Sequence, residues 1–117
     1  DSAWSYSRAL FWTIINWALK LAVYTWLLQQ FTNIEFFQSW MGATAGELSS
    51  VLPIHGIAGA GTYEAGVLVG LLPWGVENDV ALAAAVNLHL FVLGSTLLLT
   101  GLIAAATFTV KRPYAAD

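Results

Sequence analysis

The chain has 117 residues, of which 58% are hydrophobic and 9% are charged, and its formal net charge is −3. Soluble domains carry about 25% charged residues, and a soluble chain of this length could not bury so much apolar surface, so the composition indicates an integral membrane protein. The small net charge gives no sign of nucleic-acid binding, and the lack of cysteine excludes disulfides, thiolate metal sites and cysteine nucleophiles.

The first apolar run extends from Ala9 to Phe31 and follows Arg8. It exceeds the roughly 20 residues needed to cross a bilayer. A secretory signal peptide is the alternative, because Ala43-Thr-Ala45 resembles a cleavage site. However, the run is longer than the usual hydrophobic region of about 7–15 residues, and Lys20 interrupts it. A transmembrane helix is therefore favoured.

Polar residues in this first helix follow one another at steps of three or four and share one face: Thr13, Asn16, Lys20 and Tyr24. A lysine near the middle of a spanning helix costs about 2.5–3.5 kcal/mol if it faces lipid. We therefore expect Lys20 to face protein or a cavity. The alternative is that its long side chain reaches up to the membrane interface.

A second apolar segment, Phe36 to Leu52, is rich in small residues that allow helices to approach closely. Glu47 lies inside it and is costly at membrane depth unless it is paired. Pro53 ends the segment, because the residue before a proline avoids the helical conformation.

A glycine-rich stretch follows, from Pro53 to Glu64, and places three glycines within six residues: Gly56, Gly59 and Gly61. Glycine permits positive φ angles and close approach of the backbone to a ligand. Thr62 is a candidate N-cap, which puts Glu64 in the first turn of a new helix. That helix reaches only to about Leu72, and its length of roughly 15 Å is half of a bilayer core.

The last helix is expected from Val80 to about Thr109, with Asn78 or Asp79 as its N-cap. Its thirty residues would span roughly 45 Å, which is longer than a bilayer core. Three residues recur every seven positions along it and predict a packing seam: Asn87, Gly94 and Gly101.

The charges at the helix ends predict the topology. Arg8 marks one cytoplasmic end, and Lys111 with Arg112 marks the other. Two spanning helices satisfy this rule if the stretch between Glu35 and Glu77 leaves the outer side and returns to it. We therefore predict an all-α membrane protein in which two spanning helices flank a re-entrant helical hairpin. Its glycine-rich loop lies at membrane depth.

The segment Ala58-Gly-Ala-Gly-Thr-Tyr-Glu64, followed by Ala65, resembles the glycine signature of the lysylphosphatidylglycerol synthase transmembrane or flippase-like family, Gly-Gly-x-Gly-x-x-Glu-Ala. The resemblance covers roughly residues 47–102. Ala58 replaces the first glycine, Tyr63 stands where many members have arginine, and His89 fills a position that is commonly basic. The resemblance implies the C-terminal part of a multi-pass bacterial inner-membrane protein that handles anionic or lipid-linked substrates. Residues 1–117 are then one transmembrane module of a longer protein.

The glycine loop is a candidate anion cradle, in which backbone N–H groups and the N-terminus of a half-helix face a phosphate. A tight turn between packed helices is the alternative. The candidate substrate-binding residues are His55, Gly56, Gly59, Gly61, Thr62, Glu64, Lys20 and His89. Three roles stay open for Glu64: it pairs with Lys20, carries a coupled proton, or binds an amine of a headgroup. We predict that Lys20 pairs with either Glu64 or Glu47 across a polar cavity.

No histidine–carboxylate spacing indicates a metal site, and no cofactor is expected. No serine–histidine–aspartate or paired-carboxylate arrangement indicates an enzyme, so any catalysis is expected in another domain. The predicted function is a transporter or flippase-like module for an anionic or polyprenyl-linked lipid. The alternative is a membrane scaffold that binds another membrane protein or a lipid-modifying enzyme. In either case a homo-oligomer could form through the Gly94 and Gly101 face.

Overall fold

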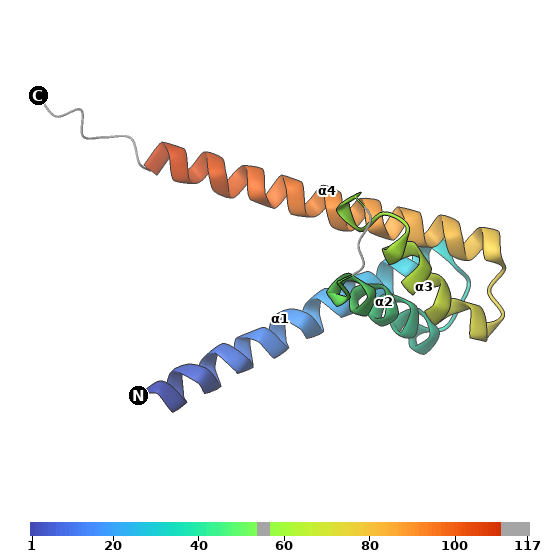
Figure 1. The fold of residues 1–117 in the computed structure, drawn as a ribbon, viewed down its shortest axis with the longest axis horizontal. Helices are drawn as coiled ribbons and strands as arrows, with labels where there is room; N and C mark the ends of the chain where they lie inside the picture. Colours follow the sequence, from blue (N-terminus) through green and yellow to red (C-terminus); the bar gives the residue numbers. More distant parts are fainter. Residues whose placement is uncertain (54–56, 111–117) are drawn as a thin grey trace, which may run out of the picture.

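The computed structural model describes residues 1–53 and 57–110 and is all-helical, with no strand among those residues (Figure 1). Its α-helices are α1 (Ser2–Phe31), α2 (Phe36–Val51), α3 (Thr62–Leu71) and α4 (Asn78–Val110). Short 3₁₀ helices lie at Ile57–Gly59 and Leu72–Trp74. The predicted all-α class is confirmed, and α1 and α4 are each long and apolar enough to cross a membrane.

The two long helices converge at one end of the molecule and diverge toward the other (Figure 1). At the converging end, which we call the closed end, α2 and α3 pack against each other and against α1 and α4. The N-terminal end of α1 and the C-terminal end of α4 lie on the same side, away from the closed end (Figure 1). The long helices therefore run in opposite directions, as the topology requires. The positive residues 111 and 112 used for that prediction lie outside the described part.

Helices α2 and α3 form an antiparallel hairpin whose contact surface is made of small residues. A Cβ atom on Gly70 would lie 2.7 Å from the Cα of Gly42, and one on Gly66 would lie 2.8 Å from the carbonyl oxygen of Ala45. Such distances leave no room for a side chain. Each helix carries two glycines four residues apart, Gly42 and Gly46 on α2 and Gly66 and Gly70 on α3. These glycines let the two backbones come into contact.

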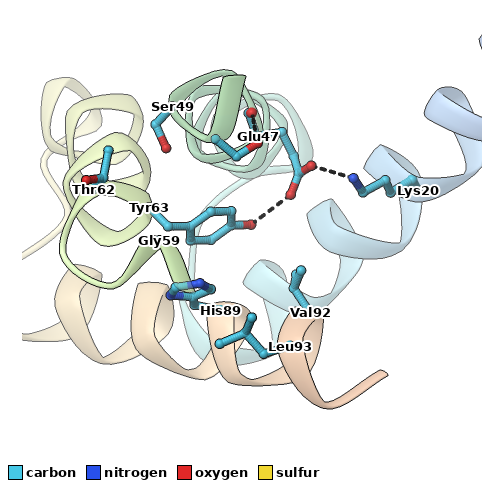
Figure 2. Close-up of a pocket in the computed structure, with 10 residues that line it drawn as sticks. Lys20, Glu47, Ser49, Gly59, Thr62, Tyr63, His89, Val92 and Leu93 are labelled. Carbon is cyan, nitrogen blue, oxygen red and sulfur yellow. Dashed lines mark hydrogen bonds and ion pairs between the residues drawn. The ribbon is translucent and has the colours of Figure 1, made fainter. Parts of the chain in front are cut away.

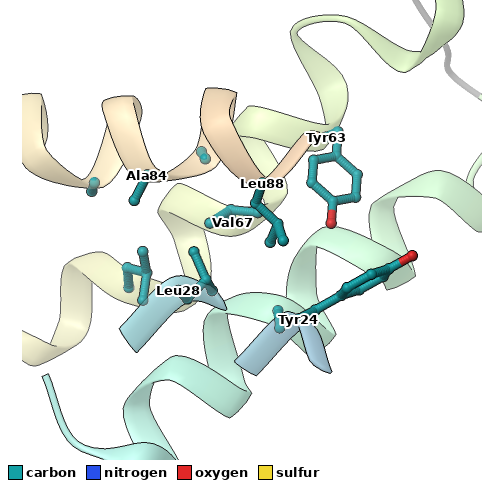
Figure 3. Packing of buried hydrophobic residues seen from close by; sticks show 10 residues of the cluster. Tyr24, Leu28, Tyr63, Val67, Ala84 and Leu88 are labelled. Carbon is teal, nitrogen blue, oxygen red and sulfur yellow. The ribbon is translucent and has the colours of Figure 1, made fainter. Parts of the chain in front are cut away.

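The buried apolar core lies at the closed end and receives residues from all four helices (Figure 3). Its fully buried large side chains are Leu28, Val67, Leu71 and Leu88. Alanines of α4 complete it and bring that helix close: Ala81, Ala84 and Ala85. Beyond the closed end, large apolar side chains of α1 and α4 are exposed, among them Leu10 and Leu97 at 62% and 73%. The core thus fixes the hairpin and leaves the far halves of both long helices uncovered by the described chain.

Three helix starts differ from the sequence predictions. Helix α1 begins at Ser2 rather than Ala9, because Ser5 and Ser7 donate hydrogen bonds to carbonyls four residues back and fit into the helix. The N-cap of α3 is Gly61 rather than Thr62. Helix α4 already includes Asn78, and the carbonyl of Glu77 accepts the N–H of Ala81. The predicted short helix is confirmed, with α3 ending at Leu71.

The turn into α3 depends on glycine. Gly59 has φ 76°, and Gly61 has φ 86° with ψ −47°. Residues with a Cβ rarely adopt these angles. The two glycines reverse the chain at the tip of the hairpin, beside α4.

Candidate functional site

Lys20 and Glu47 form an ion pair between α1 and α2, with 2.6 Å between Lys20 Nζ and Glu47 Oε2. Glu47 is buried because it lies on the face of α2 that carries Ala43 into the core. The Lys20 ammonium also lies 4.6 Å from the centre of the Trp17 ring and 5.7 Å from that of Tyr24. A costly buried carboxylate and a costly mid-helix lysine thereby compensate each other.

Tyr63 connects this pair to α4. Its hydroxyl donates a hydrogen bond of 3.2 Å to Glu47 Oε1, and its ring stacks on the ring of His89 with 4.6 Å between centroids. The side chain is only 4% exposed. In the sequence Tyr63 stands out only as a departure from a family pattern, and its contact with Glu47 was not predicted. Its position in the first turn of the short helix, next to Glu64, was the feature of the sequence from which this role could have been predicted.

His89 is held by Glu64, the acid in the first turn of α3. His89 Nδ1 lies 2.6 Å from Glu64 Oε1, and Glu64 Oε2 accepts the N–H of Gly61 at 2.8 Å. Both carboxylate oxygens are therefore engaged, one by α4 and the other by the hairpin tip. A Cβ on Gly59 would lie 3.6 Å from His89 Nε2, which is ordinary van der Waals distance, so the turn lies beside the imidazole.

A cavity of about 400 Å³ adjoins these groups (Figure 2). Helices α1 to α4 and the glycine turn line it with Lys20, Glu47, Ser49, Ser50, Gly59, Thr62, Tyr63, His89, Val92 and Leu93. One part of the wall carries charges and hydroxyls, whereas Val92 and Leu93 of α4 give it an apolar part. Such a surface suits a ligand with a polar head and an apolar body.

The structure brings most of the predicted site residues together. Lys20, Gly59, Thr62 and His89 line the cavity, whereas Glu64 and Gly61 adjoin it through His89 and the turn. His55 and Gly56 lie outside the described residues.

The predicted Lys20 pair is confirmed with Glu47 as the partner. Glu64 instead contacts His89. Thr13 and Asn16, which share the Lys20 face of α1, are exposed and do not line the cavity.

The site lies at the same distance from the closed end on both long helices. Lys20 is 11 residues before Phe31, the last residue of α1, and His89 is 11 residues after Asn78, the first residue of α4. At 1.5 Å per residue, each separation is about 17 Å. The hairpin tip thus meets the long helices well away from their ends.

The seam predicted on α4 does not pack within the described chain. Cβ atoms on Gly94 and Gly101 would meet no heavy atom within 4 Å, and Asn87 is exposed. His89, two residues from Asn87, is buried. The seam therefore stays a prediction about contact with another chain.

Within the described residues, no group of three or more histidine, cysteine, aspartate or glutamate side chains is placed to hold a metal ion. Comparisons with protein-family models, curated proteins and solved structures find no match to this chain.

Proposed function

We propose that this chain is a transporter or flippase-like module of a bacterial inner membrane, and that its cavity receives the headgroup of an anionic or polyprenyl-linked lipid. The observation that carries the proposal is the Lys20–Glu47 ion pair on the wall of a cavity, at a hairpin tip. Ionisable residues at membrane depth are costly, and they mark substrate or ion pathways in membrane proteins.

In this proposal α1 and α4 span the bilayer, and the α2–α3 hairpin is re-entrant. The site lies about 17 Å from the closed end along both long helices, and a bilayer core is about 30 Å thick. The cavity would therefore lie near the midplane. Irregular backbone such as the Gly59–Gly61 turn is tolerated there when protein or a cavity satisfies its polar groups. Transporter sites at the midplane are commonly built around broken helices of this kind.

The cavity offers suitable chemistry for a lipid headgroup. Lys20 supplies a cation whose side chain is 33% exposed, and Thr62 places a hydroxyl on the wall at the start of α3. Val92 and Leu93 supply an apolar surface for acyl or prenyl carbons. The resemblance of residues 58–65 to the flippase-like family signature supports the same substrate class.

Flux of a fluorescent phosphatidylglycerol between the leaflets of reconstituted liposomes tests this proposal. Gly59→Leu should abolish the flux, because a side chain at φ 76° strains the turn and points toward His89. Lys20→Met should lower the flux strongly because it removes the cation. Glu77→Gln is the matched control, since Glu77 is exposed and away from the cavity. Unchanged flux in Gly59→Leu would show that the site is wrong.

A second candidate function, a membrane scaffold, is favoured by one observation: the open surface around Gly94 and Gly101 on α4. Small residues at this spacing suit close contact with another helix. Leucine substitutions at both positions should then disrupt a co-purifying complex, whereas Lys20→Met should leave it intact. If the leucine variants leave the assembly intact and Lys20→Met abolishes the flux, the transporter is selected.

A further inference from the structure

The two partners of the Lys20–Glu47 pair differ in access to the cavity. The side chain of Glu47 is 5% exposed, whereas that of Lys20 is 33% exposed. Both line the cavity, but the carboxylate lies deeper, between α1 and α3, with Tyr63 on its other oxygen (Figure 2). An anion that enters the cavity therefore competes with Glu47 for the more accessible Lys20 ammonium.

Among the described residues around the cavity, the charged side chains already have partners before an anion enters. Lys20 is compensated by Glu47, and the carboxylate of Glu64 is held by His89 and by the Gly61 N–H. If an anion takes Lys20, the partner that Glu47 keeps among the described side chains is the Tyr63 hydroxyl. A buried carboxylate that loses its cation is strongly unfavourable, and protonation removes that penalty.

Glu47 is the group placed to take up that proton. The titratable groups that face it are Lys20 and Tyr24 from α1 and Tyr63 from α3. From α4, His89 stacks on the ring of Tyr63, whose hydroxyl contacts Glu47. Lys20 is the cationic partner in the ion pair, and the Tyr63 hydroxyl donates its proton in the hydrogen bond to Glu47. Of these groups, the Glu47 carboxylate is therefore the one that can accept a proton, and protonation stabilises it once its cation is lost.

We propose that the cavity binds a phosphate group at Lys20 and that, for each phosphodiester bound, Glu47 takes up one proton from the buffered solvent. The proposal rests on the proposed function, because it assumes that an anionic headgroup enters the cavity. The charges balance: a phosphodiester brings one negative charge, and the proton on Glu47 removes one. Lipid binding at this site is then coupled to proton uptake.

Calorimetry of the protein in detergent micelles, in two buffers of different ionisation enthalpy, counts the protons directly. The ligands are dihexanoyl phosphatidylglycerol and glycerophosphoglycerol, its headgroup without acyl chains. We expect uptake of about one proton per phosphodiester, and over the pH range where that uptake is complete the affinity should fall about tenfold for each unit rise in pH. If both ligands bind, the phosphodiester headgroup is sufficient for binding. If the lipid binds and its headgroup does not, acyl chains are also required. Binding of either without proton uptake overturns the proposal.

Variants assign the proton. Glu47→Gln should bind the same ligand without proton uptake and without pH dependence, and Lys20→Met should not bind it. Glu77→Gln should behave as the wild type, because Glu77 lies outside the cavity. Proton uptake that persists in Glu47→Gln overturns the proposal, and if that variant does not fold, the wild-type proton count decides alone. Flux without proton uptake contradicts only this inference, whereas absence of both flux and binding contradicts the proposed function as well.

Discussion

The ring of Tyr63 stacks on the ring of His89 at 4.6 Å and 22°, while its hydroxyl donates to Glu47. One buried side chain therefore joins the Lys20–Glu47 ion pair to the contact between His89 and Glu64. Through these contacts α1, α2, α3 and α4 are connected side chain by side chain at the hairpin tip.

Removing the Tyr63 hydroxyl should destabilise the protein while the ring stack remains. A hydrogen bond to a charged group contributes about 1.5–3 kcal/mol, so Tyr63→Phe should lower the free energy of unfolding in detergent by about that amount. Tyr63→Leu should lower it further, because the stack on His89 is lost as well. Tyr6→Phe is the matched control, since Tyr6 is 77% exposed. Equal stability of Tyr63→Phe and wild type would show that the hydroxyl does not support Glu47.

The Lys20–Glu47 pair should give strong coupling in a double-mutant cycle. Loss of one partner of a buried pair costs about 3–5 kcal/mol, and the exposed third of Lys20 places the expected cost of Lys20→Met at the lower end. The double variant Lys20→Met/Glu47→Gln should recover part of the lost stability, because neither charge is then left buried without its partner. Thermal unfolding of the four proteins measures the coupling. Lys20 and Glu64 form the control cycle, and additivity is expected there.

The His89–Glu64 contact predicts the position of a proton. A carboxylate oxygen 2.6 Å from Nδ1 requires the hydrogen to lie between them. Nitrogen-15 NMR of histidine-labelled protein should show a protonated Nδ1 for His89, with the signal assigned by its loss in His89→Gln. Glu64→Gln should shift that signal, whereas Glu35→Gln should not. A non-protonated Nδ1 in the wild type would contradict the assigned hydrogen bond.

The glycines of the α2–α3 interface should tolerate no side chain. A Cβ on Gly70 would lie 2.7 Å from backbone atoms of Met41 and Gly42, which cannot rotate away. Gly70→Ala should therefore destabilise the protein by about 1–3 kcal/mol. Gly94→Ala should be neutral or stabilising by up to about 1 kcal/mol, because its site is open and alanine favours helix. If the two variants unfold at the same temperature, the close packing of α2 on α3 is wrong.

Several features followed from the sequence because they depend on local chemistry. The apolar runs predicted the two long helices, and the short helix expected after Thr62 and ending at about Leu72 lies close to the observed limits of α3. The cost of a mid-helix charge also predicted that Lys20 needs an acidic partner. The small residues of α2 predicted close packing, although Gly66 and Gly70 of α3 were not recognised as the complement. Their four-residue spacing was the available signal.

The choice of partners was decided only by the tertiary structure. Glu47 and Glu64 were equal candidates for Lys20 in the sequence, because both lie in segments assigned to the same depth. Packing of α2 on α3 through glycine turns Glu47 toward α1, and the start of α3 at Thr62 turns Glu64 toward His89 of α4. The rotation of a helix about its axis depends on which small residues meet across the interface, and that information is not local to either segment. The sequence determined that the buried charges must be paired, and the interhelical packing determined which pairs form.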